Sequence, residues 1–409
     1  MDEKTFAVKI KDLGGSAYLV GGYVRDTVMG KSPHDKDYVV CGVSEEVFLR
    51  EFPNAKKVGG SFPVFLLQID ENMCEVAFAR TEKKHGRGYK GFAVDFGPEV
   101  TIEEDLYRRD TTMNSMARSL WGGGVVDPYG GREDIKNKTI RATSRHFTDD
   151  PVRALRAARQ SAQFGFAIDS GTIEMMRVCG DEIRDEPKER ILAETEKALA
   201  SPKPSMYFRA LNESGLLEII FPWIHSLIGR AQPIEYHPEG DAFEHTMMVL
   251  DDVSARCPRI EVRFAALMHD IGKGLTPDDM LPHHYGHEAK GLEALCEIDK
   301  AMPLPKRWYQ CAEFAIREHM RPSRMTQPGK VVDLLVRLEK HPIGADGFAA
   351  IIAADNGGAQ ADCLQNFERY ISAIRSAHGG PIPENLSGAQ IGEWIRQKEI
   401  EAYKKAADR

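Results

Sequence analysis

The sequence feature that most constrains the fold is a short apolar run that ends in two glycines and passes directly into helix-forming residues. Residues 18–26 read Tyr-Leu-Val-Gly-Gly-Tyr-Val-Arg-Asp. Glycine permits a tight turn after a strand and lets the backbone approach a ligand closely. The first N–H groups of the following helix have no intrahelical partner, so they can face an anion. The stretch therefore predicts a strand, a turn suited to phosphate, and a helix from Tyr23 to Met29.

Two aspartates follow about a dozen residues later, at the start of a β-branched run. Asp35 and Asp37 are two positions apart, and residues so spaced on a strand point to the same side. Their carboxylates repel each other, and a divalent cation relieves that repulsion. Arg25 lies one helical turn beyond the glycines. A phosphate cradle beside a metal-binding pair is the apparatus of phosphoryl transfer, with Asp35 and Asp37 as catalytic residues.

Length, charge and cysteines bound the class of protein. A chain of 409 residues is expected to form roughly two to four domains. No apolar run approaches membrane-spanning length, and the N-terminus is not a signal peptide. Seven scattered cysteines, none in a Cys-x-x-Cys pair, favour a reducing cytoplasm over a disulfide framework. With a net charge of −8, any nucleic-acid surface would be a local patch.

The rest of residues 1–140 alternates strand-like and helix-like segments. Glu75 lies on one face of a strand expected over 73–80. It is either a third carboxylate near the metal or a solvated residue. Residues 80–91 are basic and rich in glycine, which indicates an exposed loop or a mobile flap that contacts phosphate. Residues 106–116 are expected to form an amphipathic helix. Its Arg109 has the planar guanidinium that suits a triphosphate or a ribose oxygen.

Helical periodicity replaces the strand pattern from about residue 141. Asp150 precedes Pro151, which is typical of a helix N-terminus, and arginines follow at positions 153, 156 and 159. A carboxylate beside a guanidinium matches the amino donor and ring acceptor that cytosine and adenine present, and mismatches uracil and guanine. An Asp150–Arg153 pair could therefore select C and A, which leaves Arg156 and Arg159 for the triphosphate. The alternative is a helix cap and a solvated face.

The order of these motifs resembles that of the bacterial class II tRNA nucleotidyltransferases, the CCA-adding enzymes, and of the related poly(A) polymerases. The motifs occupy residues 19–26 with 35–37, then 108–114, 127–131 and 149–156. The resemblance implies that Asp35 and Asp37 hold catalytic Mg²⁺ and that tRNA, ATP and CTP are the partners. It implies nucleotide contacts at seven further residues: Gly22, Arg25, Arg109, Asp150, Arg153, Arg156 and Arg159. Asp150 and Arg153 would read the incoming base without a nucleic-acid template.

A second constellation begins at His245. Further along, an apolar helix ends in the adjacent residues His269 and Asp270, followed by Gly-Lys273, and Asp355 lies far downstream. Histidine with carboxylate ligands and open positions suits Mn, Ni, Fe or Mg rather than structural zinc. Lys273 could hold a phosphate.

This second constellation looks like the HD phosphohydrolase domain. The resemblance places His245, His269, Asp270 and Asp355 in the ligand positions, with Ni²⁺, Mn²⁺ or Mg²⁺ as the divalent cation. It further implies 2′,3′-cyclic phosphodiesterase, 2′-nucleotidase and phosphatase activities. Four other histidines are expected to be surface residues or substrate contacts: His283, His284, His287 and His319.

The expected architecture is α+β: an α/β nucleotidyltransferase head with a mixed sheet (1–140), an all-α neck that reads base and tRNA (141–230), an all-α HD body (231–375) and a helical tail (376–409). The tail either packs on the body or contacts RNA. Two other functions stay open, a poly(A) polymerase and an HD hydrolase with a degenerate head, and a non-catalytic RNA-binding module is least favoured. The chain is expected to act as a monomer or homodimer.

Overall fold

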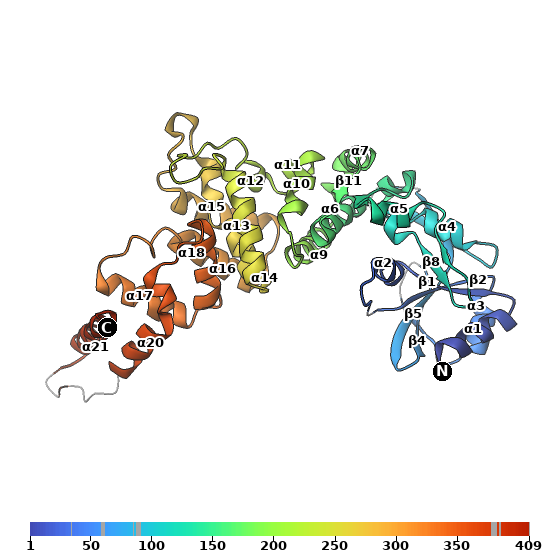
Figure 1. Ribbon diagram of the computed structural model, residues 1–409, viewed down its shortest axis with the longest axis horizontal. Helices are drawn as coiled ribbons and strands as arrows, with labels where there is room; N and C mark the ends of the chain where they lie inside the picture. Colours follow the sequence, from blue (N-terminus) through green and yellow to red (C-terminus); the bar gives the residue numbers. More distant parts are fainter. Residues whose placement is uncertain are drawn as a thin grey trace. The chain divides into compact units, whose positions relative to one another are not determined.

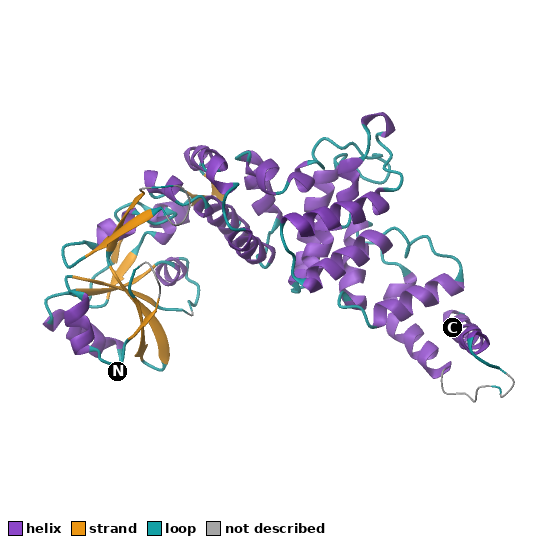
Figure 2. Cartoon of the chain, turned by 180° about the vertical axis from the view of Figure 1, so that it is seen from behind, coloured by secondary structure: helices purple, strands orange, loops and turns teal. Residues whose placement is uncertain are grey.

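The computed structural model describes residues 1–33, 35–58, 62–84, 86, 91–377, 383 and 386–408. The chain forms two compact units (Figure 1). The head unit comprises Met1–Thr195 and Met206–Ile220, and the body unit comprises Glu196–Ser205 and Phe221–Arg409. All strands of the described residues belong to the head unit, whereas the body unit is helical (Figure 2). This division into a mixed head and an all-helical body matches the fold expected from the sequence.

A seven-stranded mixed sheet forms the centre of the head unit. Its strands are β1 (Ser16–Val20), β2 (Asp37–Cys41), β3 (Lys56–Val58), β4 (Val64–Ile69), β5 (Asn72–Phe78), β8 (Ala117–Ser119) and β9 (Val125–Val126). They lie in the order β3-β4-β5-β2-β1-β8-β9. Strand β2 is antiparallel to β1 and parallel to β5, so Asp37 lies opposite Val20 on one side and Glu75 on the other.

Alternation along the central strands buries both faces of this sheet. On one face, Leu19 and Val40 pack with side chains from α1 (Glu3–Asp12) and α3 (Glu45–Glu51). On the other face, Val20 and Val39 pack with Leu106 of α4 (Ile102–Tyr107). Asp37 shares the parity of Val39, so it opens β2 on the face that α4 covers. The Gly-Gly turn then leads from β1 into α2 (Gly22–Val28), as predicted.

Two local predictions for the head unit are wrong. The single helix expected over 106–116 ends with α4, and the chain continues as an extended residue, Thr111, into the 3-10 turn η1 (Thr112–Asn114). Part of the expected loop over 80–91 is strand β6 (Arg80–Lys84), which pairs with β7 (Phe92–Phe96). Residues 85 and 87–90, where a flap was expected, lie outside the described residues.

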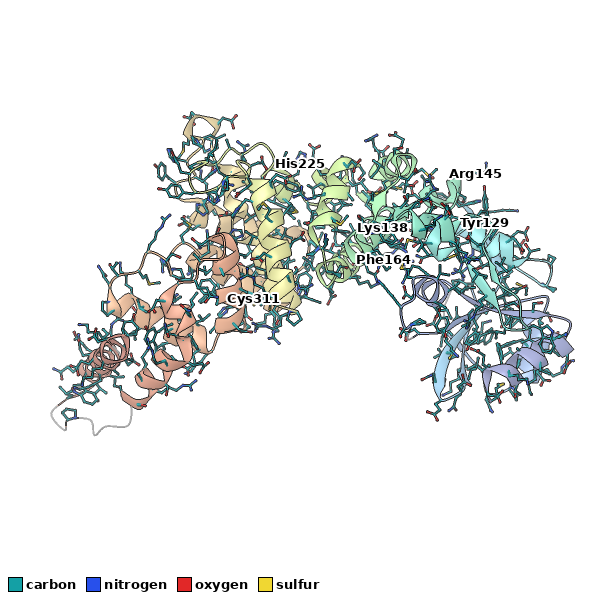
Figure 3. The ribbon with its side chains drawn as sticks, in the orientation of Figure 1. Tyr129, Lys138, Arg145, Phe164, His225 and Cys311 are labelled. Atoms are coloured by element: carbon teal, nitrogen blue, oxygen red, sulfur yellow. The ribbon has the colours of Figure 1, made fainter. Side chains whose placement is uncertain are left out.

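A short parallel pair of strands interrupts the region expected to be entirely helical. It joins β10 (Thr139–Ile140) to β11 (Ala167–Ile168). Around it lie α5 (Gly131–Lys136), η2 (Arg145–Asp149), α6 (Val152–Phe164), α7 (Ser170–Val178), α8 (Gly180–Ile183), α9 (Lys188–Leu199), α10 (Ser205–Glu213) and α11 (Leu216–Ile220). Helix α6 begins directly after Asp150-Pro151, as the sequence predicts, and ends at Phe164, which Figure 3 labels.

The body unit is a stack of helices around one apolar core. Its elements are α12 (Pro222–His225), α13 (Ala242–Arg256), α14 (Ile260–Met268), η3 (Ile271–Leu275), η4 (Asp278–Met280), α15 (His287–Ala301), α16 (Lys306–Glu318), α17 (Pro328–Glu339), α18 (Gly344–Asp355), α19 (Asp362–Gln365), α20 (Phe367–Ser376) and α21 (Ala389–Ala407). Cys311, labelled in Figure 3, lies in this core. All seven cysteines are free.

The C-terminal helix α21 packs on the body unit, which was one of the two roles expected for the tail. Ile400 and Tyr403 contact the apolar core, and Arg396 forms an ion pair of 2.7 Å with Asp333 on α17. Within the described residues, no helix has both the length and the apolar character needed to cross a membrane.

Candidate functional site

The glycine turn and the aspartates meet at one edge of the head sheet. Gly21 has a φ of +64°, a backbone conformation that residues other than glycine rarely adopt. The turn follows Val20, and Val20 pairs with Asp37 across β1 and β2. Glu75 pairs with Asp37 from the other neighbour, β5. The register therefore brings the glycine turn together with the carboxylates of Asp37 and Glu75. Glu75 thus lies beside the proposed metal-binding pair of aspartates.

The carboxylates at this edge influence each other. Desolvation by the surrounding chain raises the pKa of Asp37, and the charges of Glu75 and Asp35 raise it further, while Arg109 acts in the opposite direction. Asp37 nevertheless keeps contact with solvent, and Asp35 is exposed. Such a group of carboxylates has an excess of negative charge at an accessible position, which suits it to a hard divalent cation.

Two arginines lie against the glycine turn. A Cβ atom on Gly21 would be 3.3 Å from Arg109 Nη1, and one on Gly22 would be 3.5 Å from Arg25 Nη2. A Cβ atom on Gly21 would crowd the Arg109 guanidinium, whereas one on Gly22 would make an ordinary contact with Arg25. Arg25 also donates 2.8 Å hydrogen bonds to Asp26 and to Asn114. The glycine turn therefore has two cationic side chains beside it.

Asp105, on α4, holds Arg109 in place. Its fully buried carboxylate accepts hydrogen bonds from Arg109 at 2.8 and 3.1 Å, and it also forms an ion pair with Arg108. Burial alone would raise the pKa of Asp105, but the charges of Arg108 and Arg109 outweigh burial and hold the pKa well below its ordinary value. The arginine is therefore fixed by a carboxylate that stays ionised.

A buried polar network connects the turn to α6. Arg25 donates to Asn114, and Asn114 donates at 3.0 Å to Asp110. Asp110 also accepts hydrogen bonds from Arg156 at 2.8 Å and from Gln160 at 3.2 Å. Burial would raise the pKa of Asp110. The charge of Arg156 and the hydrogen bonds that Asp110 accepts nevertheless hold this pKa well below its ordinary value. Asp110 therefore orients Asn114 and Arg156.

The proposed base-reading residues both have other partners in this structure. Asp150 accepts a 3.1 Å hydrogen bond from the backbone of Val152 and forms a 2.9 Å ion pair with Arg190. Arg153 is buried and forms a 2.9 Å ion pair with Glu82 on β6. A base that engages both side chains would have to displace these partners.

The last arginine of the predicted stripe also has an acidic partner. Arg159 Nε lies 2.6 Å from Glu194 on α9. Of the stripe, Arg156 is the residue that the structure connects to the glycine turn, through Asp110.

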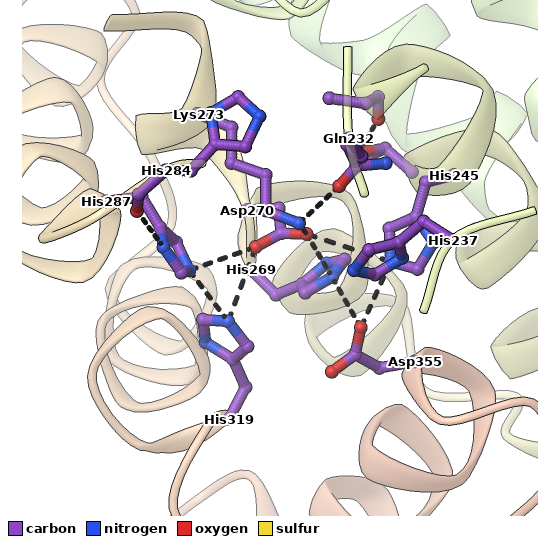
Figure 4. A network of polar contacts seen from close by, with 12 residues as sticks. Gln232, His237, His245, His269, Asp270, Lys273, His284, His287, His319 and Asp355 are labelled. Carbon is purple, nitrogen blue, oxygen red and sulfur yellow. Dashed lines mark hydrogen bonds and ion pairs between the residues drawn. The ribbon is translucent and has the colours of Figure 1, made fainter. Parts of the chain in front are cut away.

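In the body unit, the predicted HD residues converge from three separate parts of the chain (Figure 4). His245 lies on α13, His269 follows α14, Asp270 precedes η3 and Asp355 ends α18. Ligand atoms of these four residues all lie within 4.8 Å of one another. His245 Nε2 is 3.0 Å from Asp355 Oδ1, and His269 Nε2 is 3.2 Å from Asp270 Oδ2.

The neighbours of the two imidazoles fix which ring nitrogen faces the cluster. His269 Nδ1 lies 2.7 Å from the carbonyl oxygen of Ala266, and His245 Nδ1 lies 2.6 Å from the carboxylate of Glu239. Because these oxygens can only accept, each Nδ1 carries the proton, and Nε2 is the nitrogen directed at the cluster. Histidine ligands of metals are commonly oriented by such partners.

The electrostatics of this cluster favour a cation. Burial alone would lower the pKa of His269, but the carboxylates of Asp270 and Asp355 raise it to about 10. The pKa of Asp270 is held well below its ordinary value by Lys273 and His269, against the effect of burial. Within the described residues, His269 Nε2 and Asp270 Oδ1 are buried without a hydrogen bond of good geometry, and Asp270 Oδ2 forms an ion pair with Lys273. A donor set of two imidazoles and two carboxylates fits a divalent cation.

Some secondary predictions for this site are corrected by the structure. His287 and His319 were expected at the surface or in contact with substrate, but both are buried beside Asp270. The phosphate contact of Lys273 stays a prediction; in this structure its Nζ is 2.6 Å from Asp270 Oδ2 and also contacts Gln232. His284 hydrogen-bonds Thr276 and the backbone of Ala231.

Several residues of both centres were not found from the sequence. Asp105 has a local signal, because it precedes Arg108 and Arg109 by three and four positions on a helix. Glu82 and Arg153 are 71 residues apart, and no sequence pattern links them. Glu239 precedes His245 by six residues in a proline-rich loop, where spacing carries no meaning.

Three protein families match successive parts of the chain. Residues 17–141 match the poly A polymerase head domain, and residues 165–228 match a family described as the probable RNA and SrmB-binding site of polymerase A. Residues 242–402 match the HD domain.

Curated relatives span nearly the whole chain. The multifunctional CCA protein of Acinetobacter baumannii strain SDF is 38% identical over 400 residues, which cover 94% of this chain and 96% of the relative. That of Methylococcus capsulatus is 40% identical over 408 residues, which cover 95% of this chain and 94% of the relative.

Solved structures share the fold. The Bacillus stearothermophilus CCA-adding enzyme in complex with CTP matches with a TM-score of 0.69 and 22% identity, over 99% of this chain and 92% of that chain. A tRNA nucleotidyltransferase complexed with a primer tRNA and an incoming ATP analog matches with a TM-score of 0.60 and 21% identity, over 92% of this chain and 99% of that chain.

Proposed function

This chain belongs to the family of multifunctional CCA proteins, and from that membership we propose how its two centres divide the chemistry. It is a tRNA nucleotidyltransferase with an HD phosphohydrolase-type domain. The head unit would use CTP and ATP to add CCA to the 3′ end of tRNA. One feature of the fold supports this assignment above all: the sheet register that sets Asp37 between the glycine turn and Glu75. We place this tRNA-processing activity in the cytoplasm.

Asp35 and Asp37 would hold Mg²⁺ at the head centre. When bound, the cation would neutralise charge on the α-phosphate and favour the ribose oxygen of the RNA as nucleophile. The chain's own contribution is orientation and charge. Backbone N–H groups after Gly21 and the guanidinium groups of Arg25 and Arg109 would surround the triphosphate, where the fixed Arg109–Asp105 pair limits the loss of side-chain entropy on binding.

Asp150 and Arg153 would select the base. Asp150 would accept from the amino group of cytosine or adenine, and Arg153 would donate to the adjacent ring nitrogen. To do so, Arg153 would leave Glu82 and Asp150 would leave Arg190. A wrong base would then leave these charged groups unpaired, and unpaired buried polar groups are costly.

The decisive experiment follows nucleotide addition directly. A tRNA that ends at the discriminator base is incubated with each NTP alone and with all four, and the products are sequenced. The wild-type chain should add C, C and A and reject U and G, whereas Asp35→Ala should add nothing. Glu46→Ala is a matched carboxylate control, because Glu46 is exposed on α3 and pairs with Arg50. Unchanged addition by Asp35→Ala would refute the assignment.

A second activity is proposed for the body unit because its four HD residues converge on one buried point. We propose that His245, His269, Asp270 and Asp355 hold a divalent cation and that the site hydrolyses phosphate esters, with 2′,3′-cyclic nucleotides as the first substrate class to try. Hydrolysis of 2′,3′-cyclic AMP should need Mn²⁺, Ni²⁺ or Mg²⁺ and should be lost in the double variant His269→Ala/Asp270→Ala. His283→Ala is the control, because His283 is exposed and stacks on Tyr285. An active double variant would reject the site.

A further inference from the structure

Phe164, the last residue of α6, presents the face of its ring to two cationic side chains of the head unit (Figure 3). The guanidinium carbon of Arg25 lies over this ring at 4.7 Å from its centre, and Lys31 Nζ lies over it at 4.9 Å. The negative face of an aromatic ring attracts a cation at such a distance. The contact joins α6, which begins with the proposed base-reading residues, to α2, which follows the glycine turn.

The end of α6 fixes where this ring lies. Gly165 follows Phe164 with a φ of +69°, a left-handed conformation that terminates the helix, and its N–H donates at 2.8 Å to the carbonyl oxygen of Ser161. Earlier in the helix, Leu155 is fully buried, so α6 is anchored in the core of the head unit. Phe166 packs against Phe164 with the two ring centres 5.8 Å apart. The ring is therefore held by a helix end and by a second aromatic side chain.

The guanidinium group of Arg25 is held at two of its three nitrogens. Nε donates to Asp26 and Nη1 donates to Asn114, each at 2.8 Å. Nη2 lies beside the glycine turn, 3.5 Å from the position of a Cβ atom on Gly22, and within the described residues it has no hydrogen-bond partner. One nitrogen is thus left for an anion at the turn.

The two hydrogen bonds of Arg25 do not fix the orientation of its guanidinium plane. They leave the group free to tilt about the line that joins Nε and Nη1, and such a tilt moves Nη2 away from the turn. The Phe164 ring lies against the face of the group, where it opposes this tilt. The ring therefore supplies the restraint that the hydrogen bonds lack.

Helix α6 also reaches Arg25 by a polar route. Arg156 donates to Asp110, which accepts from Asn114, and Asn114 accepts from Arg25. Arg156 precedes Phe164 by about two helical turns. One helix therefore acts on the edge of the Arg25 guanidinium through this network and on its face through the aromatic ring.

We propose that Phe164 is a positioning residue of the nucleotidyl-transfer site, whose ring holds Arg25 so that Nη2 meets the triphosphate of CTP or ATP. The proposal rests on the triphosphate contact of Arg25 proposed above. In this role Phe164 touches neither nucleotide nor RNA. It acts on the affinity for nucleotide, and its effect depends on the electron density of the ring face, whereas simple apolar packing depends on the size of the side chain.

The test changes the electron density of the ring while its size stays nearly constant. In the full chain, Phe164 is replaced by monofluoro-, difluoro- and trifluorophenylalanine, and CMP addition to tRNA is measured against CTP concentration. Each fluorine weakens the negative face, so the KM for CTP should rise stepwise, by about fivefold for the trifluoro ring. The KM for tRNA and kcat should stay within about twofold, because the contact serves nucleotide binding alone. A KM for CTP that ignores fluorination would overturn the proposal.

The same series at Phe166 is the matched control. Its ring packs on Phe164, and no cation lies over it within the described part of the chain. Fluorination of Phe166 should leave the KM for CTP unchanged. An equal rise at both positions would mean that fluorine acts through packing, which would also overturn the proposal.

Two further variants identify the cation on which the ring acts. The dependence on fluorination at Phe164 should persist in Lys31→Met, and its loss there would assign the effect to Lys31 and overturn the proposal. Arg25→Gln should raise the KM for CTP by about tenfold, as expected for the loss of a hydrogen bond to a charged group, and should abolish the dependence. An unchanged KM in Arg25→Gln would refute the triphosphate contact itself. A raised KM in Arg25→Gln without any dependence on fluorination in the wild-type background would refute the role of Phe164 alone.

Discussion

The two acidic centres of this protein differ in how deeply their side chains are buried and in how firmly those side chains are held. In the head unit, Asp35 and Asp37 keep contact with solvent, and the proposed base-reading residues Arg153 and Asp150 form ion pairs with Glu82 and Arg190 that a base would have to displace. In the body unit, His269 and Asp270 are fully buried, and each imidazole nitrogen that faces away from the cluster has its own acceptor. The head centre therefore depends on its substrate to complete it, whereas the body centre is assembled before substrate arrives.

This difference fits the ligand proposed for each site. A site that exchanges nucleotides during one reaction cycle gains from accessible carboxylates and from cationic side chains with interchangeable partners. A site that keeps a resident cation gains from burial, because ligands in fixed positions lose little entropy when the cation binds.

The largest expected effect is that a substitution in either centre abolishes the activity of that centre and leaves the activity of the other unchanged. Asp37→Ala should reduce nucleotide addition to tRNA by on the order of 10³-fold, because several kcal/mol of charge stabilisation in the transition state would be lost. Its hydrolysis of 2′,3′-cyclic AMP should stay within about twofold of the wild type. His269→Ala should give the reverse pattern. Both activities are measured on the same preparations, and a parallel loss of both activities in either variant would break the comparison.

A smaller effect is expected on the choice of base. Asp150→Asn replaces an acceptor by an amide that both donates and accepts, so the edges of uracil and guanine could be satisfied. A well-aligned bidentate contact discriminates by ~1–3 kcal/mol, which predicts that the ratio of UMP to CMP incorporation rises about tenfold. Single-nucleotide addition with competing NTPs measures this ratio.

The control for base choice is the preceding aspartate. Asp149→Asn should leave the ratio unchanged, because the Asp149 carboxylate contacts His146 at 2.6 Å rather than Arg153 or Arg190. Equal ratios in Asp150→Asn and the wild type would place base selection on other residues.

The sequence predicted those parts of both centres that depend on neighbours along the chain. The Gly-Gly turn, the start of α6 after Asp150 and the His269-Asp270 pair at a helix end are all local features, and the structure has them where they were predicted. A turn or a cap is determined by a few adjacent residues, so its pattern survives whatever tertiary structure surrounds it.

The parts that depend on tertiary contacts were missed or wrong. The helix expected over 106–116 is broken because Asp110 is buried in a network with Arg156 and Gln160, 46 and 50 residues away. His287 and His319 are 32 residues apart in the sequence, and they become neighbours only when α15 and α16 pack together. Burial of single polar residues is decided by such packing, and no local periodicity reports it.

Cation binding should stabilise the two units unequally. At a free Mn²⁺ concentration 100 times the dissociation constant, binding contributes about 2.7 kcal/mol to a folded state. For a unit of this size that corresponds to a rise in Tm of roughly 5–10 °C. We expect this rise for the body unit and little change for the head unit, measured by differential scanning calorimetry with and without chelator. His269→Ala should lose most of the rise, and an equal rise in that variant would mean that Mn²⁺ acts elsewhere.

The smallest expected effect concerns Glu75. It distinguishes a metal ligand from a carboxylate that only lies near the metal. Its charge helps to raise the pKa of Asp37, so Glu75→Gln should lower that pKa in the metal-free protein. A carboxylate that only adds to the local negative charge should, when neutralised, raise the Mg²⁺ concentration needed for half-maximal nucleotide addition severalfold while the rate at saturating Mg²⁺ hardly changes. A ligand would behave differently, because its loss lowers the saturated rate as Asp37→Ala does. Carbon-13 titration of the aspartate carboxyls and Mg²⁺ dependence of addition measure both quantities, and a loss of rate that excess Mg²⁺ cannot restore would make Glu75 the third ligand of the head centre.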